Sequence, residues 1–229
     1  MSPAKHEVAT CRIALINPNT STKATALMLS SARLGLPPQV QVEGRTARQG
    51  TVLITNQTAL DEAATLVADY GVEVAAEGFD ALIISGFGDP GLEALRQRVN
   101  IPVFGIAQAG ISEAAHGGRR YAIVTVTPDL LASLEQAAKT HGQDGTLVSI
   151  RFTDGPLAAV MSTPQDLEVA LLSACETAMN VDLAQAIVIG GGPLAQAAQA
   201  IAERLHIPVI DPVVSAMRLA IKALSSRQG

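Results

Sequence analysis

Short apolar runs alternate along the chain with longer stretches in which apolar residues recur every three or four positions. The short runs are typical of buried β-strands and the longer stretches of amphipathic helices, so the pattern predicts repeated strand–helix units. The predicted strands cover residues 12–17, 40–44, 81–85, 103–106, 122–125, 147–152, 186–189 and 209–211. The predicted helices cover residues 22–34, 58–77, 91–98, 109–116, 130–140, 164–180, 193–205 and 213–224.

Several predicted strands are apolar throughout and do not alternate between apolar and polar residues. Residues 81–84, for example, read Ala-Leu-Ile-Ile. This pattern suits strands that are covered by helices on both faces, as in parallel sheets. The sequence therefore predicts an α/β fold.

Three blocks of the first half of the chain recur in the second half at a nearly constant spacing. Residues 12–16 match 120–124 at an offset of 108, 81–86 match 186–191 at 105, and 100–103 match 206–209 at 106. Shared use of Ile, Val and Gly inflates such matches in α/β proteins, but three blocks at one offset indicate a duplicated lobe. We expect two pseudo-symmetric lobes, each a parallel sheet flanked by helices, with an active-site cleft between them.

The same comparison divides the chain into segments. We expect residues 1–10 to form a disordered tail, since they contain no apolar stretch. Residues 11–107 with 212–229 are predicted to form the first α/β lobe, and residues 108–211 the second.

Composition narrows the class of partner. Of the 229 residues, 48% are hydrophobic and only 16% are charged, so most of the chain must be packed inside a fold. The net charge of −5 provides no excess of basic residues to bind phosphates, and 3% aromatic residues with no Trp provide few rings on which bases could stack, so nucleic acid is not an expected partner. No apolar run approaches the roughly 20 residues that cross a bilayer, and the first residues lack a secretory signal pattern. We therefore expect a cytoplasmic protein that binds a small molecule.

The cysteines and histidines give little chemistry. Cys11 heads an apolar run and Cys175 lies within a helical pattern, so we expect both to be buried and inert. The four histidines lack the spacing of metal ligands, and no metal site is predicted.

Candidate site residues come from the turns that follow strands, because ligands of open α/β sheets bind beyond the carboxyl ends of strands. The first turn reads Asn17-Pro-Asn-Thr20-Ser21. We expect the amide of Asn17 to contact a ligand. Thr20 and Ser21 are either ordinary helix caps or, at the N-terminus of the next helix, donors to a ligand oxygen.

The second turn, residues 86–91, matches G-x-G-x-x-G formally. The match is weak as a dinucleotide signal, because Pro90 lacks an N–H group and no acidic residue ends the following strand. The backbone at Gly88 is expected to approach a small anion. Asp89 is either a helix cap or a site residue.

The third and fourth turns are Thr125-Val-Thr127 and Gly190-Gly191-Gly192. They are the repeat equivalents of the first two, so hydroxyl and backbone donors from both lobes should converge on the cleft. Asp211 is either a fixed carboxylate in this site or a turn-forming residue.

Four motifs resemble the aspartate/glutamate and hydantoin racemases, most closely the hydantoin and allantoin branch. They are Ile16-Asn17-Pro18-Asn19-Thr20, Phe87-Gly88-Asp89-Pro90-Gly91-Leu92, Val124-Thr125-Val126-Thr127 and Ile207-Pro208-Val209-Ile210-Asp211. The resemblance implies two lobes with the site between them, no cofactor, and a homo-oligomer. It also implies two catalytic cysteines, one thiolate removing a proton from carbon while the opposite thiol delivers one. The matching positions of this chain are Gly86 and Gly191.

Three hypotheses follow for the function. The first is an isomerase-like or lyase-like enzyme acting on a small carbonyl, imide or carboxylate compound, with Asp89, Ser85 or Thr127 and water as acid and base. The second is a binder of the same ligand class without turnover. The third is a nucleotide-dependent oxidoreductase that uses the turn at 86–91. Under the first two, the predicted substrate-binding residues are Asn17, Thr20, Phe87, Gly88, Thr125 and Gly192.

Overall fold

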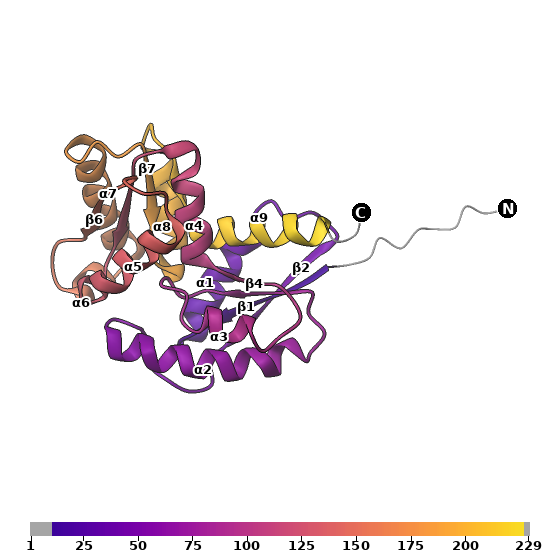
Figure 1. Cartoon of the computed structure of the whole chain (residues 1–229). Coiled ribbons are helices and arrows are strands. Elements are labelled where there is room, and N and C mark those ends of the chain that lie inside the picture. Colours follow the sequence, from indigo (N-terminus) through magenta and orange to yellow (C-terminus); the bar gives the residue numbers. More distant parts are fainter. Residues whose placement is uncertain (1–10, 227–229) are drawn as a thin grey trace.

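The computed structural model describes residues 11–226, which form two four-stranded parallel sheets flanked by helices (Figure 1). The first sheet has the order β2-β1-β3-β4 and the second β6-β5-β7-β8, so both follow one scheme. The predicted α/β fold with two lobes is confirmed. The strands are β1 (Cys11–Asn17), β2 (Val40–Thr46), β3 (Ala81–Ile84), β4 (Val103–Gly105), β5 (Tyr121–Thr125), β6 (Leu147–Phe152), β7 (Ala186–Ile189) and β8 (Val209–Ile210).

The central strand pairs explain why the apolar runs are continuous. In the first sheet Ile13 pairs with Ala81 and Ile16 with Ile84, and in the second Tyr121 pairs with Ala186. All residues of β3 and β7 are fully buried. Strands of this kind need apolar side chains on both faces.

The helices lie close to their predicted positions, with ends shifted by a few residues. They are α1 (Thr22–Ala32), α2 (Gln57–Ala75), α3 (Leu92–Arg96), α4 (Ile106–Ala114), α5 (Leu131–His141), α6 (Leu157–Val160), α7 (Pro164–Asn180), α8 (Ala195–Ala202) and α9 (Pro212–Ser225). The short helix α6 was not predicted. Helix α4 begins three residues before the predicted start, directly after β4, because the carboxylate of Asp89 caps its first turn.

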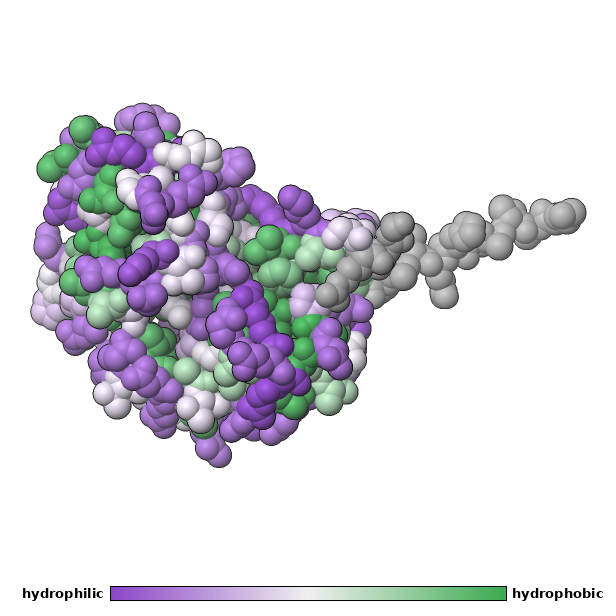
Figure 2. All heavy atoms as spheres, in the orientation of Figure 1, coloured by the Kyte–Doolittle hydropathy of each residue, from purple (hydrophilic) through white to green (hydrophobic). Residues whose placement is uncertain are grey.

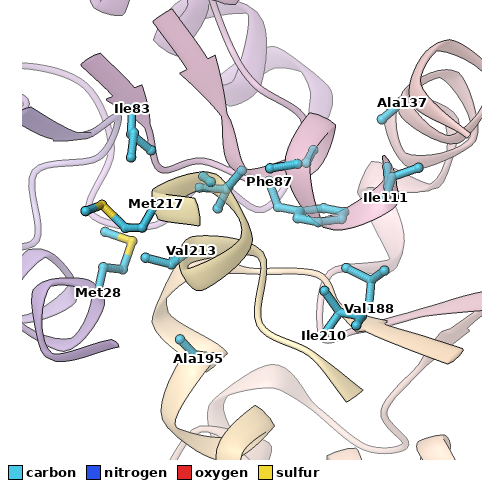
Figure 3. Close-up of a cluster of buried hydrophobic side chains, with 14 of the residues drawn as sticks. Met28, Ile83, Phe87, Ile111, Ala137, Val188, Ala195, Ile210, Val213 and Met217 are labelled. Carbon is cyan, nitrogen blue, oxygen red and sulfur yellow. The ribbon is translucent and has the colours of Figure 1, made fainter. Parts of the chain in front are cut away.

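One hydrophobic core joins the two lobes (Figure 3). Met28 and Phe87 belong to the first lobe, Val188 to the second, and Val213 and Met217 to α9. A fully buried side chain of this size contributes about 1.5–3 kcal/mol relative to an exposed one, so this shared core fixes one lobe against the other.

Helices α4 and α9 make the junction between the lobes. Helix α9 packs against α1, β3 and β4, whereas α4 contacts α9, α5, β4 and β7 (Figure 1). Because α4 touches both sheets, the predicted lobe boundary between residues 107 and 108 stays a prediction. The predicted tail at residues 1–10 lies outside the described residues.

On the face shown in Figure 2, hydrophilic (purple) residues are interspersed with smaller apolar (green) areas. On the first lobe, Arg12 and Arg45 pair with Glu43, and Arg45 also pairs with Glu77. The hydrogen bond from Arg12 is the main cause that lowers the pKa of Glu43. Within residues 11–226, no helix has the length and apolarity that a membrane crossing requires.

Candidate ligand site between the two lobes

A cavity of about 70 Å³ lies where the strand-end turns of the two lobes meet. Gly86 follows β3 and Gly191 follows β7, and both line this one cavity, as the repeat predicted. Its other polar or backbone contributors are Pro18, Asn19, Ser85, Thr125, Thr127, Gly190, Gly192 and Pro193. A catalytic role for these positions stays a prediction.

Asn17 is placed differently from our expectation. Its side chain is fully buried and does not line the cavity. Its Nδ2 donates to Asn19 Oδ1 at 2.9 Å, to the Ser21 carbonyl at 3.0 Å and to Thr25 Oγ1 at 3.0 Å. Its Oδ1 accepts from the Asn19 N–H at 3.1 Å. The Nδ2 group of Asn17 is therefore fully used within the turn and the first part of α1, so it has no N–H left to donate to a ligand.

Thr20 also lies outside the cavity lining, because its backbone N–H and hydroxyl both donate to the Thr51 carbonyl. Ser21 is the N-cap of α1 and accepts from the Ala24 N–H. Pro18 and Asn19 are the residues of this turn that line the cavity, and our sequence analysis named neither as a ligand contact. The Oδ1 of Asn19 is engaged with Asn17 and Ser21, which leaves Nδ2 to face a ligand.

Three hydroxyl groups line the cavity, and they differ in what they can offer. Ser85 donates to the Ile16 carbonyl at 2.9 Å, and Thr125 donates to the Gly190 carbonyl at 2.5 Å. These two can only accept from a ligand. Thr127 Oγ1 lies 3.5 Å from Thr125 Oγ1, a weak contact, so its proton is available to the cavity.

Asp89 was a candidate acid or base, but it does not line the cavity. Its Oδ1 accepts from the Ala107 N–H at 2.8 Å and its Oδ2 from the Gln108 N–H at 2.7 Å. The structure thus favours the helix-cap alternative, with the cap placed on α4. Burial raises the pKa of Asp89 to about 7, against the two backbone hydrogen bonds, which lower it.

Gly88 and Asp89 line a second hollow of about 540 Å³ on the outer side, between α2 and α5. His141 also lines this hollow, with its Nε2 3.9 Å from Asp89 Oδ2. Leu60 lines both hollows and so lies between them. Gly88 is therefore placed away from the ligand position predicted for it.

The remaining chemically interesting residues also lie elsewhere. Asp211 caps α9 by accepting from the N–H groups of Val213 and Val214, which favours its turn-forming alternative. Cys175 is buried as expected, and burial raises its pKa to about 12. Cys11 is only half-buried, which corrects our expectation. It is the first residue of β1 and therefore lies at the opposite end of the sheet from the strand ends that line the cavity. The described residues contain no cluster of three metal-ligating side chains.

Among the described residues that line the cavity, none has an ionisable side chain. Half of the lining is apolar, and sequence reasoning missed most of this wall. Besides Phe87, the wall includes Leu53, Ile54, Leu60, Val126, Leu130, Leu134, Met161 and Leu194. Leu53 and Ile54 come from the loop between β2 and α2, where no hydrophobic period marks them.

Neighbouring atoms pack closely against the glycines that line the cavity. A Cβ on Gly86 would lie 2.6 Å from Cγ of Pro18, so a larger residue requires the proline ring to move. At Gly191 the nearest atom to a Cβ is Leu194 Cδ1 at 3.0 Å, and its φ of +157° also favours glycine. A Cβ on Gly190 would lie 3.2 Å from the Phe87 ring, so the two lobes touch here.

Comparison with known proteins agrees with this architecture. Residues 13–220 match the family Asp/Glu/Hydantoin racemase. A hydantoin racemase of Rhizobium meliloti is 32% identical over 91% of this chain and 86% of that protein. One from Paenarthrobacter aurescens is 31% identical over 91% of this chain and 89% of that protein.

Solved structures give the same result. An allantoin racemase from Klebsiella pneumoniae has a TM-score of 0.89 and 29% identity, over 95% of this chain and 89% of that one. Unliganded arylmalonate decarboxylase, at 18% identity and a TM-score of 0.65 over 93% and 92% of the two chains, shares the fold. On the evidence of the repeat, the strand-end cavity and these matches, the chain belongs to the Asp/Glu/hydantoin racemase family.

Proposed function

We propose that the protein binds a small cyclic amide or imide with an apolar substituent in the cavity between the lobes, and that it does not racemise this ligand by two-base proton transfer. One observation carries the proposal: an apolar wall faces hydroxyl, amide and backbone groups, and no ionisable side chain lies between them. The relatives named hydantoin racemases support the ligand class.

The polar side of the cavity suits a neutral ring with both N–H and C=O groups. Ser85 and Thr125 accept hydrogen bonds, while Thr127 and the Nδ2 of Asn19 donate them. Each such bond contributes about 0.5–1.5 kcal/mol net, and burial of apolar area adds about 25 cal/mol per Å². A few bonds with a small apolar contact correspond to a Kd of roughly 10–1,000 μM.

The absence of turnover by two bases follows from proton-transfer chemistry. Removing and returning a proton on opposite faces of one carbon requires two positioned groups, each worth about 10²–10⁴-fold in rate. Gly86 and Gly191, which the family resemblance implies are the positions of the two catalytic cysteines, carry no side chain, and Asp89 caps α4 outside the cavity.

Calorimetry with each enantiomer of 5-isopropylhydantoin tests the ligand class. We expect both to bind, and Ile54→Asp, which puts a charge in the apolar wall, to weaken binding at least tenfold. Val52→Asp is the matched control, because Val52 lies in the same loop and is 68% exposed. Unchanged affinity in Ile54→Asp, or no binding by the parent protein, would contradict the proposal.

A second candidate is slow isomerase-like or lyase-like turnover through Thr127 and a water molecule. The observation that favours it is the Thr127 hydroxyl, the one among the three cavity hydroxyls that gives no proton to the backbone. Deuterium uptake at C5 of the hydantoin in D₂O measures such turnover. If this candidate is right, uptake exceeds the protein-free rate and is lost in Thr127→Val.

A further inference from the structure

We propose that Asp89 is a positioning residue, which ties the cavity wall at residues 85–87 to the first turn of α4. In this role Asp89 holds the cavity wall in place but does not itself touch the ligand. The proposal concerns the architecture of the cavity and stands independently of which ligand binds there.

The turn that carries Asp89 is tightly determined. The Asp89 N–H donates to the Gly86 carbonyl at 2.9 Å, and the Asp89 carbonyl accepts from the Leu92 N–H at 3.2 Å. Asp89 has a φ of +51°, a conformation that is uncommon for residues other than glycine. Asp adopts this conformation more readily than most side chains, and two hydrogen bonds to its carboxylate hold it here.

Those two points lie at the start of α4. The N-cap of α4 is Gly105, which has no side chain to cap the helix. A Cβ on Gly105 would overlap the Asp89 carboxyl group, so that group occupies the space of the missing cap side chain. Its two oxygens take the N–H groups of Ala107 and Gln108, where a negative charge also suits the helix dipole.

Helix α4 carries the restraint to the second lobe. It packs against α5 and β7 (Figure 1). The Leu134 side chain of α5 lines the cavity. On the other side of the turn, Phe87 is buried beside Gly190 of the second lobe, where a Cβ on Gly190 would lie 3.2 Å from both the Phe87 ring and the Ile123 side chain, and Phe87 and Ile123 belong to one core cluster. Asp89 therefore sits in a closed ring of contacts from the cavity wall to α4, to the second lobe and back to Phe87.

The charged neighbours of Asp89 come from three elements. His141 of α5 lies 3.9 Å away, Arg96 of α3 lowers the pKa of the carboxyl group, and Glu93 of α3 raises it. Asp61 of α2 lines the same outer hollow. Burial is the largest influence and brings the pKa of Asp89 to about 7, so the restraint changes its charge near neutral pH.

Amide and aromatic NMR of the ligand-free protein between pH 5.5 and 8.5 tests the proposal. In the parent protein we expect the Ala107, Gln108 and Gly190 amides to shift with one midpoint near pH 7. The nuclear Overhauser contact between the Phe87 ring and the Ile123 methyl should weaken over the same range as pH falls. Gly190 and Ile123 are informative because they lie in the second lobe, whereas a purely local effect of Asp89 would stop at α4.

Three variants separate the possible causes. Asp89→Asn should abolish the shared titration and give the weak Phe87–Ile123 contact at every pH. His141→Gln and Asp61→Asn remove the neighbouring ionisable groups, and both variants should keep the shared titration. The proposal is overturned if Gly190 and Phe87 do not respond in the parent protein, or if the response is lost in His141→Gln. If Asp89→Asn does not fold, the parent and the two control variants still decide the question.

Discussion

The turns after β1 and β5 occupy equivalent places in the two lobes but use their polar side chains in opposite ways. After β1, the amide of Asn17 makes four hydrogen bonds within its own turn and helix. After β5, Thr125 makes one close hydrogen bond to a neighbouring carbonyl, and Thr127 is left facing the cavity. The two lobes thus share their geometry, whereas the polar side chain of one turn is used within the fold and that of the other lines the cavity.

The difference shows how to separate the two roles in this molecule. A polar side chain whose donors and acceptors are all taken by nearby backbone and side chains stabilises the fold, because leaving any of those partners unpaired is costly. The Nδ2 group of Asn17 and both carboxylate oxygens of Asp89 are engaged with such partners. Thr127 and Asn19 line the cavity and each keep one unused donor, so we propose that a ligand is recognised through them.

Substitution of Asn17 should have the largest effect. Asn17→Ala leaves several buried groups unpaired, so we expect the free energy of unfolding to fall by about 2–4 kcal/mol. Thr125→Val, at the equivalent place in the second lobe, removes one bond and should cost about 1–2 kcal/mol. Urea denaturation measures both. Equal losses in the two variants would break the comparison.

The next largest effect is expected at the contact between the two lobes. A Cβ on Gly192 would overlap Met28 Sδ and lie 2.9 Å from the Ser85 carbonyl. We expect Gly192→Ala to destabilise the protein by about 1–3 kcal/mol through overpacking. Combining it with Met28→Ala should cost less than the sum of the two single changes, and simple additivity would show that the lobes do not meet at this point.

The pH dependence of stability tests Asp89. Its pKa is near 7 in the folded state against an ordinary value of 3.8, so between these values the native state binds more protons than the unfolded state. The free energy of unfolding should therefore fall as pH rises from 4 to 7, by at most about 1.4 kcal/mol per pH unit from this group. Asp89→Asn should lack this pH-dependent contribution. Identical slopes of unfolding free energy against pH in the two proteins would refute the assignment to Asp89.

The smallest effect on stability is expected for Thr127. Thr127→Val keeps the shape of the side chain and removes a hydroxyl that has only one weak partner, so unfolding should change by less than about 0.5 kcal/mol. Affinity for 5-isopropylhydantoin should fall by roughly 2–12-fold, as loss of one hydrogen bond implies. A large loss of stability with unchanged affinity would place Thr127 with the scaffold.

Much of the fold could be predicted from the sequence because it depends on local and periodic signals. The runs at 81–84 and 186–189 are apolar on both faces, which marks central parallel strands, and the constant offset between them reveals the repeat. From the strand ends follow the cavity and the positions of Gly86, Gly191, Thr125 and Thr127 on its lining.

The remaining site features depend on contacts that a sequence pattern does not encode. The partners of Asp89 are backbone N–H groups 18 and 19 residues away, and no side-chain motif marks them. Met161 and Ile54 reach the cavity from irregular segments without hydrophobic periodicity. The hydrogen bonds of Asn17 within its own turn could have been predicted from the sequence, because Asn-x-Asn before a helix favours a local side-chain turn. Self-association stays a prediction, which the mass in solution would test.

The central claim is that the cavity binds its ligand without a pair of bases. The most direct measurement is deuterium uptake at C5 of each enantiomer of 5-isopropylhydantoin in D₂O at a protein concentration that saturates the ligand, with the hydantoin racemase of Rhizobium meliloti as positive control. We predict that deuterium uptake and the loss of optical rotation both stay within tenfold of their protein-free rates. Uptake accelerated by 10²-fold or more, with loss of optical rotation, would contradict the account, because it requires a positioned acid–base group in the cavity.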